Sequence, residues 1–309
     1  MKIVIAEPLG VKKEHICEVF GRCLPLKNVD LVIWETPAAD EEEWLARCVD
    51  ADILVEVNYP LAREFFEKCG KLRLVAVAFA GVDHIDTEVC AEKGIEIRNC
   101  PGYSADAVAE LVFGLITAVK RQIIPLNEAV RRGDTRNGSV GTEIGGKRFG
   151  IVGYGYIGKR VATLAKAYGC EVFVTTRHPG VADDVTFVSL EKLLATCDIV
   201  SLHLPLTEES RGLINEEKIA LMKDGAILIN TARGAVVDSE ALAKAVESGK
   251  LAGAAVDVFE TEPPLKRDHP LLNSEKIIAT PHIGFATEEA FETRLEMSVK
   301  NIADFIVGR

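Results

Sequence analysis

A short apolar run, a glycine-rich turn and an amphipathic stretch follow one another at residues 149–168, and no other feature of the chain restricts its fold as strongly. The turn reads Gly153-Tyr154-Gly155-Tyr156-Ile157-Gly158. Glycines at this spacing let a strand turn sharply into a helix and let the backbone approach a pyrophosphate, which the free N–H groups at the helix start attract. The pattern predicts the first unit of a dinucleotide-binding fold, and the alternative is a tight turn of purely structural use.

Apolar, β-branched runs recur along the chain in two series. Because strands buried on both faces of a parallel sheet read as continuous apolar runs, we expect each series to form an open parallel sheet covered by crossover helices. At 309 residues the chain is long enough for two such α/β domains. The expected strands are Ile3–Ala6, Leu31–Trp34, Ile53–Val57, Leu74–Ala78 and Ile95–Ile97 in the first series, and Phe149–Val152, Val172–Thr175, Ile199–Leu202, Ala226–Asn230, Gly253–Val258 and Ile277–Ala279 in the second.

Charge and cysteine content exclude several classes of protein. The formal net charge is −11 and no basic stretch offsets it, so a nucleic-acid partner is not expected. The eight cysteines form no C-x-x-C pair and have no histidines at zinc spacing, which favours reduced thiols in a cytoplasmic protein without a bound metal. No window approaches the roughly 18 apolar residues of a membrane span, so we expect no membrane partner either.

The second strand of the later series ends in Thr175-Thr176-Arg177-His178. An enzyme that uses NAD usually has an acid here, about 20 residues beyond the glycine loop, to bind the adenosine ribose. A hydroxyl at Thr176 and a guanidinium at Arg177 would instead bind and neutralise a 2′-phosphate. We therefore expect NADP or NAD as the cofactor, with NADPH favoured; alternatively Arg177 is a solvated loop residue and either cofactor serves.

Three polar side chains follow successive strands of the later series: Arg233, Glu262 and His282. The carboxyl ends of parallel strands meet at one edge of a sheet, where open α/β folds bind their ligands. A guanidinium can hold a substrate carboxylate, an imidazole can protonate a carbonyl oxygen as hydride arrives, and a carboxylate beside that imidazole keeps it charged. We predict these three as the catalytic group of a 2-oxo acid reductase. Singly, each has an ordinary structural alternative.

Two further histidines follow predicted strands. His203, in Ser201-Leu202-His203-Leu204-Pro205, is expected to line the cofactor site. His84 lies in the turn Ala80-Gly81-Val82-Asp83-His84. Backbone N–H groups of that turn are suited to a substrate carboxylate, although a plain strand-to-helix turn explains the segment equally well.

The chain as a whole resembles the D-isomer-specific 2-hydroxyacid dehydrogenase family. The matching blocks are AGVDHID from Ala80, NCPGYSADAVAE from Asn99, GIVGYGYIG from Gly150, DIVSLHLPLTEESRGLI from Asp198, ARGAVVD from Ala232, GAAVDVFETEPP from Gly253 and TPHIG from Thr280. The resemblance implies a flavodoxin-like substrate domain (residues 1–99 and 285–309), a Rossmann coenzyme domain (residues 100–284), hydride transfer between NAD(P)H and a D-2-hydroxy acid or its 2-oxo acid, and a homodimer.

Carried over residue by residue, the family's catalytic arginine, glutamate and histidine match Arg233, Glu262 and His282. The substrate contacts implied are Ala80, Gly81, Val82 and Arg233. The cofactor contacts expected from the residues and the resemblance together are Gly153, Gly155, Tyr156, Ile157, Gly158, Thr176, Arg177, His203, Pro205, Thr231, Ala232, Arg233, Asp257, His282 and Gly284.

Alternatives remain for the substrate and for the class of protein. Glyoxylate or hydroxypyruvate reduction is the leading hypothesis. Phosphoglycerate dehydrogenases, which the chain also resembles, bring an arginine to the substrate phosphate near Val55-Glu56-Val57-Asn58, and an acid at Glu56 would disfavour a phosphorylated substrate. A different class with the same fold is a corepressor-like sensor of NAD(H), for which a proton donor such as His282 has no use.

Overall fold

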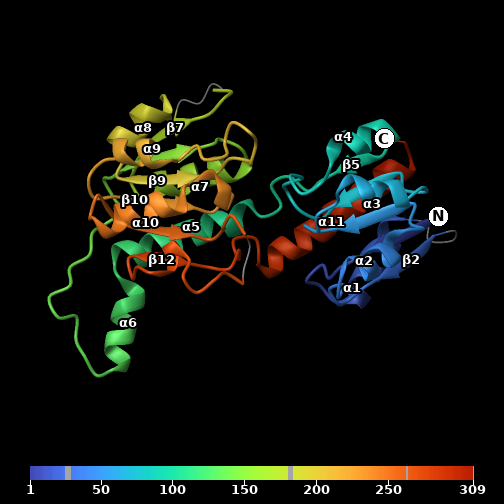
Figure 1. The fold of residues 1–309 in the computed structure, drawn as a ribbon, viewed down its shortest axis with the longest axis horizontal. Helices are drawn as coiled ribbons and strands as arrows, with labels where there is room; N and C mark the ends of the chain where they lie inside the picture. The colour runs from blue at the N-terminus through green and yellow to red at the C-terminus, as the bar shows by residue number, and fades with distance from the viewer. Residues whose placement is uncertain (25–28, 180–183, 262–263, 309) are drawn as a thin grey trace. The chain divides into compact units, whose positions relative to one another are not determined.

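The computed structural model describes residues 1–24, 29–179, 184–261 and 264–308, and the chain divides into two compact units (Figure 1). Unit 1 comprises Met1–Ser104 and Ala286–Arg309, and unit 2 comprises Ala105–Phe285. Each unit is built around its own parallel sheet.

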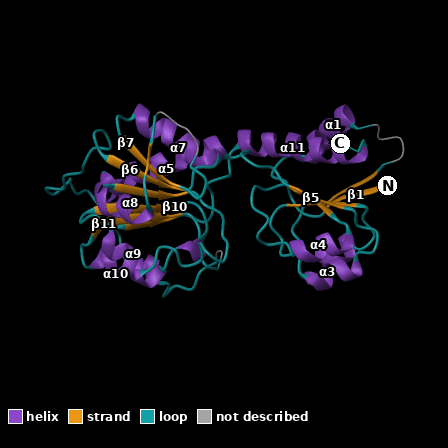
Figure 2. Ribbon diagram, turned by 90° about the horizontal axis from the view of Figure 1, so that it is seen from above, coloured by secondary structure: helices purple, strands orange, loops and turns teal. Residues whose placement is uncertain are grey.

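Unit 1 has a five-stranded sheet in the order β2-β1-β3-β4-β5 with every neighbouring pair parallel, which is the flavodoxin-like order. Helices α1 and α11 cover one face, and α3 and α4 cover the other (Figure 2). The strands are β1 Lys2–Ile5, β2 Asp30–Ile33, β3 Ile53–Glu56, β4 Leu74–Val77 and β5 Glu96–Arg98, and the helices are α1 Lys13–Cys23, α2 Glu41–Cys48, α3 Arg63–Lys68, α4 Thr87–Lys93 and α11 Glu288–Ile306.

Unit 2 has a seven-stranded parallel sheet in the order β12-β11-β10-β9-β6-β7-β8. Counted from β6, this is the Rossmann order with one additional strand at the β12 edge. Helices α5 and α7 lie on one face, and α9 and α10 on the other (Figure 2). The strands are β6 Arg148–Val152, β7 Glu171–Thr175, β8 Thr186–Phe187, β9 Ile199–Leu202, β10 Ala226–Asn230, β11 Leu251–Val256 and β12 Ile277–Ala279, and the helices are α5 Ala105–Lys120, α6 Ile123–Arg131, α7 Tyr156–Ala167, α8 Leu190–Thr196, α9 Glu216–Leu221 and α10 Ser239–Glu247.

The predicted fold class, two doubly wound parallel-sheet domains, is confirmed. Three details of the sequence interpretation are wrong. Strand β8 was not expected, because a two-residue edge strand is too short to leave an apolar pattern. Strand β11 ends at Val256, so Val258 lies beyond it. Helix α6 was also missed; it begins after Gln122, whose φ of +53° separates it from α5.

Six strands of unit 2 end in one row across the sheet. Hydrogen-bonded pairing aligns Thr175 with Val152, Val152 with Leu202, Leu202 with Asn230, Asn230 with Val256 and Val256 with Ala279. The residues that follow these six strands therefore leave the sheet at one level. We call them the strand-end row: Thr176, Gly153, His203, Thr231, Asp257 and Thr280.

Among the described helices, none combines the length and the apolar character that a membrane crossing requires.

Candidate active site

The three glycines of the loop in unit 2 do not serve the same purpose: two are required by close packing and one leaves open space. Gly153 has a φ of +96°, and a Cβ there would lie 2.2 Å from the carbonyl oxygen of His203. A Cβ at Gly158 would lie 2.1 Å from the carbonyl oxygen of Gly153. A Cβ at Gly155 would meet nothing within 4 Å. The outer two glycines are thus required for packing, and Gly155 leaves space at the start of α7.

Helix α7 begins with Tyr156 and Ile157, and its N-cap residue is Gly155, which has no side chain that could accept a hydrogen bond. The N-cap residue therefore leaves the first N–H groups of the helix available to a ligand. Together with the space beside Gly155, they form a suitable binding site for the pyrophosphate of a dinucleotide.

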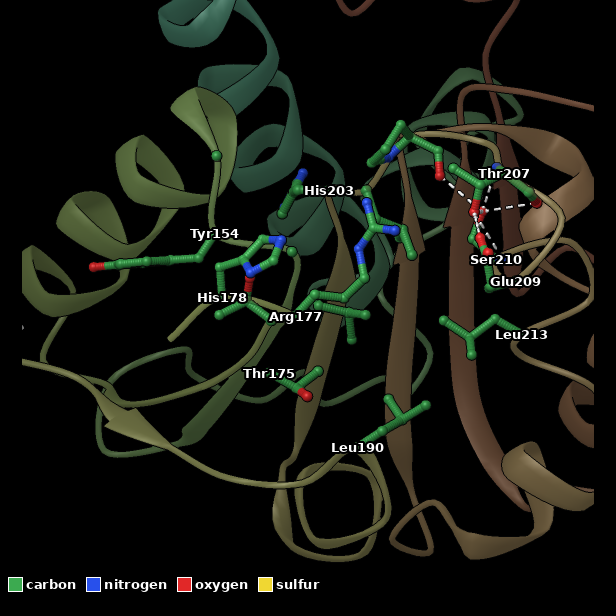
Figure 3. A pocket seen from close by; sticks show the side chains of 16 residues that line it. Tyr154, Thr175, Arg177, His178, Leu190, His203, Thr207, Glu209, Ser210 and Leu213 are labelled. Carbon is green, nitrogen blue, oxygen red and sulfur yellow. Dashed lines mark hydrogen bonds between the residues drawn. The ribbon is translucent and has the colours of Figure 1, made fainter. Parts of the chain in front are cut away.

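A cavity of about 440 Å³ lies beside this loop, at the point where the order of strands reverses between β6 and β9. Figure 3 shows Arg177 and His178 on one side of it and the turn Thr207–Ser210 on the other. The predicted cofactor residues that line the cavity are Gly153, Gly155, Thr176, Arg177, His203 and Pro205. Its volume and its place at the topological switch point suit the adenosine half of a dinucleotide.

The Thr207–Ser210 turn was not singled out in the sequence. Its backbone is fixed by short hydrogen bonds: the Thr207 N–H donates to the Ser210 hydroxyl over 2.7 Å, and that hydroxyl donates to the Pro205 carbonyl over 2.8 Å. A Thr and a Ser three residues apart, directly after a strand and a proline, were the available signal.

Charge in this cavity is arranged around Arg177, which is exposed. Across the cavity, Glu209 accepts a hydrogen bond from the Thr207 hydroxyl over 2.7 Å. That bond, and to a smaller extent the charge of Arg177, lowers the pKa of Glu209. The loop after β7 itself, through His178, carries no carboxylate.

Two buried polar atoms of the strand-end row have no hydrogen-bond partner within the described residues: Nδ1 of His203 and Oγ1 of Thr231. The other ring nitrogen of His203 lies 2.8 Å from the Ser201 hydroxyl. Burial lowers the pKa of His203 to about 3, so its imidazole is neutral at physiological pH. Buried polar atoms normally have partners, and a bound dinucleotide would supply hydrogen-bonding groups at this edge of the sheet. The unpaired atoms and the glycine loop thus both fit such a cofactor.

The turn that carries Arg233 is held by Asn230, the buried last residue of β10. The Asn230 side chain accepts a hydrogen bond from the Ala232 N–H and donates one to the Arg233 carbonyl, each over 3.0 Å. The next residue, Gly234, lies against another strand-end loop: a Cβ there would be 1.8 Å from the carbonyl carbon of Phe259. Arg233 therefore lies in a turn that is fixed on both sides.

Asp257 organises the loop that carries His282. Its carboxylate is buried, and it accepts hydrogen bonds from the Thr280 hydroxyl over 2.6 Å, the Ile283 N–H over 2.9 Å and the Gly284 N–H over 2.7 Å. The His282 N–H donates to the Asp257 carbonyl over 2.8 Å. His282 itself has a φ of +54°, a left-handed conformation that a non-glycine residue keeps only when its surroundings hold it.

Arg233 and His282 thus follow two strands, β10 and β12, that flank β11 at the same edge of the sheet. Glu262, the third predicted catalytic residue, lies outside the described residues, so its position is not assigned. Its neighbour Glu260 accepts a hydrogen bond from the Ser239 hydroxyl. The catalytic assignment of all three residues stays a prediction.

In unit 1, the predicted substrate turn Ala80–Val82 follows β4, and all three of its residues are partly exposed. Glu56, at the end of β3, is fully buried, and both of its oxygens lie close to Nε2 of His84, at 3.1 and 3.0 Å. The sequence interpretation treated Glu56 as an acid that would repel a substrate phosphate. Because the carboxylate is buried against an imidazole, that argument does not hold.

Comparison with known proteins identifies the family. The sequence profile described as "D-isomer specific 2-hydroxyacid dehydrogenase, NAD binding domain" matches residues 113–284. The glyoxylate reductase of Thermococcus litoralis is 38% identical over 296 residues, covering 91% of this chain and 89% of that protein. The hydroxypyruvate reductase of Blautia hydrogenotrophica is 34% identical over 322 residues, covering 100% and 98%. The D-3-phosphoglycerate dehydrogenase of Methanocaldococcus jannaschii is 38% identical over 297 residues, covering 94% of this chain and 54% of that protein.

Solved structures agree with these sequence matches. An acyclic imino acid reductase in complex with NADPH and D-Arg superposes with a TM-score of 0.91 at 27% identity, covering 100% of this chain and 98% of that one. The D-lactate dehydrogenase of Aquifex aeolicus, complexed with NAD and lactic acid, gives a TM-score of 0.86 at 31% identity, covering 100% and 96%. The chain belongs to the D-isomer-specific 2-hydroxyacid dehydrogenase family and is an NAD(P)-dependent oxidoreductase that interconverts small 2-oxo acids and D-2-hydroxy acids.

Proposed function

We propose that the protein is an NADPH-preferring reductase of a small unphosphorylated 2-oxo acid, glyoxylate or hydroxypyruvate. The observation that carries the proposal is the strand-end row of unit 2. The glycine loop, Arg233 and His282 all follow strands that end at one level of one sheet. Binding groups for the cofactor and for the carbonyl that receives the hydride must lie close together, and strands that end at one level of one sheet satisfy this requirement.

The proposed chemistry assigns one task to each side chain. The bound nicotinamide supplies the hydride. Arg233 binds the substrate carboxylate through its planar guanidinium and so orients the neighbouring carbonyl. His282 donates a proton to the carbonyl oxygen, which becomes the hydroxyl of the product. For Glu262 we propose, from its place in the sequence, that its carboxylate keeps the imidazole of His282 protonated.

The preference for NADPH is supported by the cavity at the switch point. Thr176 and Arg177 line it where a ribose-binding acid is usual, and no carboxylate stands in that loop through His178. Hydrogen bonds to a charged group contribute about 1.5–3 kcal/mol. Replacement of Arg177 by Ala is therefore expected to lower kcat/KM for NADPH by about 10- to 150-fold and to leave that for NADH unchanged.

The preference for an unphosphorylated acid is supported by two facts. Glyoxylate and hydroxypyruvate reductases are among the relatives that match over nearly their whole length. The strand ends of unit 1 at residues 53–60 and 78–86 contain no lysine or arginine that could bind a phosphate. Glu56 is not part of this argument, because its carboxylate is buried.

The test is initial-rate kinetics with NADPH and NADH against glyoxylate, hydroxypyruvate, pyruvate and phosphohydroxypyruvate. We expect the highest kcat/KM for glyoxylate or hydroxypyruvate with NADPH. A higher value for phosphohydroxypyruvate with NADH would replace the proposal by a phosphoglycerate dehydrogenase activity. In the same assay His282→Ala should lower kcat by about 10²- to 10⁴-fold, the usual contribution of a general acid, with NADPH binding retained.

We also propose a cytoplasmic homodimer. All eight cysteines are free thiols, and six of them are buried, as expected in a reducing compartment. Large apolar side chains are exposed on α6 and in the segment after it, and Figure 1 shows this helix extending away from the sheet of its unit. These side chains are Ile123, Ile124, Val130 and Val140. Sedimentation of the protein should give twice the chain mass, and the substitution Ile124→Asp should reduce the sedimenting mass to that of one chain.

A further inference from the structure

We propose that Glu56 and His84 in unit 1 share one proton, and that this makes His84 a hydrogen-bond donor to the anionic substrate and a determinant of substrate affinity. The inference rests on the proposed function, because it concerns the same 2-oxo acid. It gives a role to the side chain of His84, for which the sequence interpretation considered only the backbone of the turn, and which is not part of the family's catalytic group.

The first step is the geometry of the pair. Nε2 of His84 lies 3.0 and 3.1 Å from the two oxygens of Glu56, within hydrogen-bond distance of both. The Glu56 side chain has no exposed surface, and the His84 side chain keeps 13% of its surface exposed. The carboxylate is therefore hidden behind the imidazole. The pair offers only its histidine to anything that approaches.

The second step is the charge of the surroundings. Glu7, after β1, is close to His84 and accepts a hydrogen bond from the Val57 N–H over 2.7 Å. Arg294 of α11 is buried, donates to the Leu9 carbonyl and offsets the charge of Glu7. Within the turn itself, Asp86 is engaged as the N-cap of α4, and Asp83 is exposed. Because the charges of Glu7 and Arg294 offset each other, only the charge of the Glu56–His84 pair remains. That pair is neutral when it holds one proton more than a carboxylate beside a neutral imidazole.

The third step follows from imidazole chemistry. If the shared proton is on His84, both ring nitrogens carry hydrogen. If it is on Glu56, the carboxyl group donates to Nε2 and the neutral ring must carry its hydrogen on Nδ1. In both states Nδ1, on the far side of the ring from Glu56, is a donor. Burial raises the pKa of Glu56, with the bond to His84 opposing that rise, so loss of the shared proton would leave an unfavourable buried charge.

The fourth step is the location. His84 ends the turn that begins with Ala80–Val82, the predicted contact for the substrate carboxylate. The strand ends at residues 53–60 and 78–86 contain one histidine, His84, and no lysine or arginine. A donor from His84 would therefore supplement the backbone N–H groups of this turn.

The test is a double substitution, Glu56→Leu with His84→Phe, which removes the pair without leaving one buried polar partner behind. We expect KM for the 2-oxo acid to rise by about 10- to 150-fold, as for the loss of a hydrogen bond to a charged group. We expect kcat, KM for NADPH and Tm to change little.

The matched control is His15→Asn. His15 also bonds a glutamate of unit 1, Glu292, at 2.7 Å, but it lies on α1 and not at a strand end. Its substitution should leave every kinetic constant unchanged. An unchanged KM for the 2-oxo acid in the double variant would show that the Glu56–His84 pair is only structural and would overturn the inference.

A second measurement does not depend on activity. Nitrogen NMR of the free protein should show hydrogen on Nδ1 of His84 at neutral pH, and Nδ1 without hydrogen would equally refute the proposal. Failure of the proposed function is a separate result, since it would appear as absence of turnover by the wild-type protein with every 2-oxo acid.

Discussion

Replacement of Asp257 by Asn tests whether a buried carboxylate positions the proposed proton donor. The three groups that donate to Asp257 are divided unequally between its oxygens. The Thr280 hydroxyl and the Ile283 N–H donate to Oδ1, and the Gly284 N–H donates to Oδ2. An amide with its oxygen in the Oδ1 position keeps the first two bonds. Its NH2 group then faces the Gly284 N–H, so one bond is lost and two donors oppose each other.

The expected magnitude follows from these contacts. Loss of one hydrogen bond to a charged acceptor costs about 1.5–3 kcal/mol. Burial raises the pKa of Asp257, so the neutral amide avoids part of a desolvation cost, and we take about 2 kcal/mol as the net loss. If the His282 loop must be ordered in the transition state, this corresponds to a decrease of about 30-fold in kcat/KM for the 2-oxo acid.

The assay is steady-state kinetics together with direct titration of NADPH, because Asp257 is also a predicted cofactor contact. Positioning through His282 predicts that kcat falls and its pH profile shifts while the Kd of NADPH changes little. Thr280→Val is the matched control: it removes a single donor and should have a smaller effect of the same kind. A kcat/KM for Asp257→Asn within twofold of wild type, or a loss confined to NADPH binding, would refute this reasoning.

Three other predictions follow from the described contacts. Gly155→Ala should weaken NADPH binding but leave Tm unchanged, since its Cβ meets nothing within 4 Å. Gly158→Ala should lower Tm, because its Cβ would lie 2.1 Å from a carbonyl oxygen. Equal Tm values for the two variants would contradict this prediction. Gly234→Ala should abolish activity and lower Tm, with a Cβ 1.8 Å from a backbone carbonyl carbon of the loop after β11. The hydrogen bond to Glu292 raises the pKa of His15 above 6.5. The Tm difference between wild type and His15→Asn should therefore be present below pH 6.5 and disappear as pH rises through the raised pKa. A Tm difference that does not change with pH would show that another contact is responsible.

The strands were the most predictable part of the fold. A strand buried on both faces of a parallel sheet must be apolar throughout, so its end is visible where the apolar run meets a polar residue. Asn230 marks such an end in the sequence, whereas the polar Asp257, directly after Val256, falls within a predicted strand that in fact ends before it. Strand β8 could not be found in this way, because Thr186 and Phe187 form no run.

The partner of a buried charge was not predictable. Glu56 directly follows three apolar residues, and its sequence neighbours do not reveal whether its side chain is exposed. Its environment is set by the pairing of β3 with β4, which aligns Glu56 with Val77, and by the turn that then returns His84 to the same edge. The separation of 28 residues between acid and base is a property of the tertiary fold, which local pattern does not contain.

The candidate site shows the same division between local pattern and tertiary contact. That Arg233 and His282 follow strands is a local fact, and the sequence predicted it. That residue 234 must be glycine is not local: neighbouring parallel strands lie only about 4.8 Å apart, so loops that leave β10 and β11 at one level compete for the same space. Gly234 admits the backbone of Phe259 at a distance that no Cβ allows. The turn of Arg233 is thereby packed against the loop after β11 at Phe259, so a side chain at position 234 would disturb the turn of Arg233 and that loop at once.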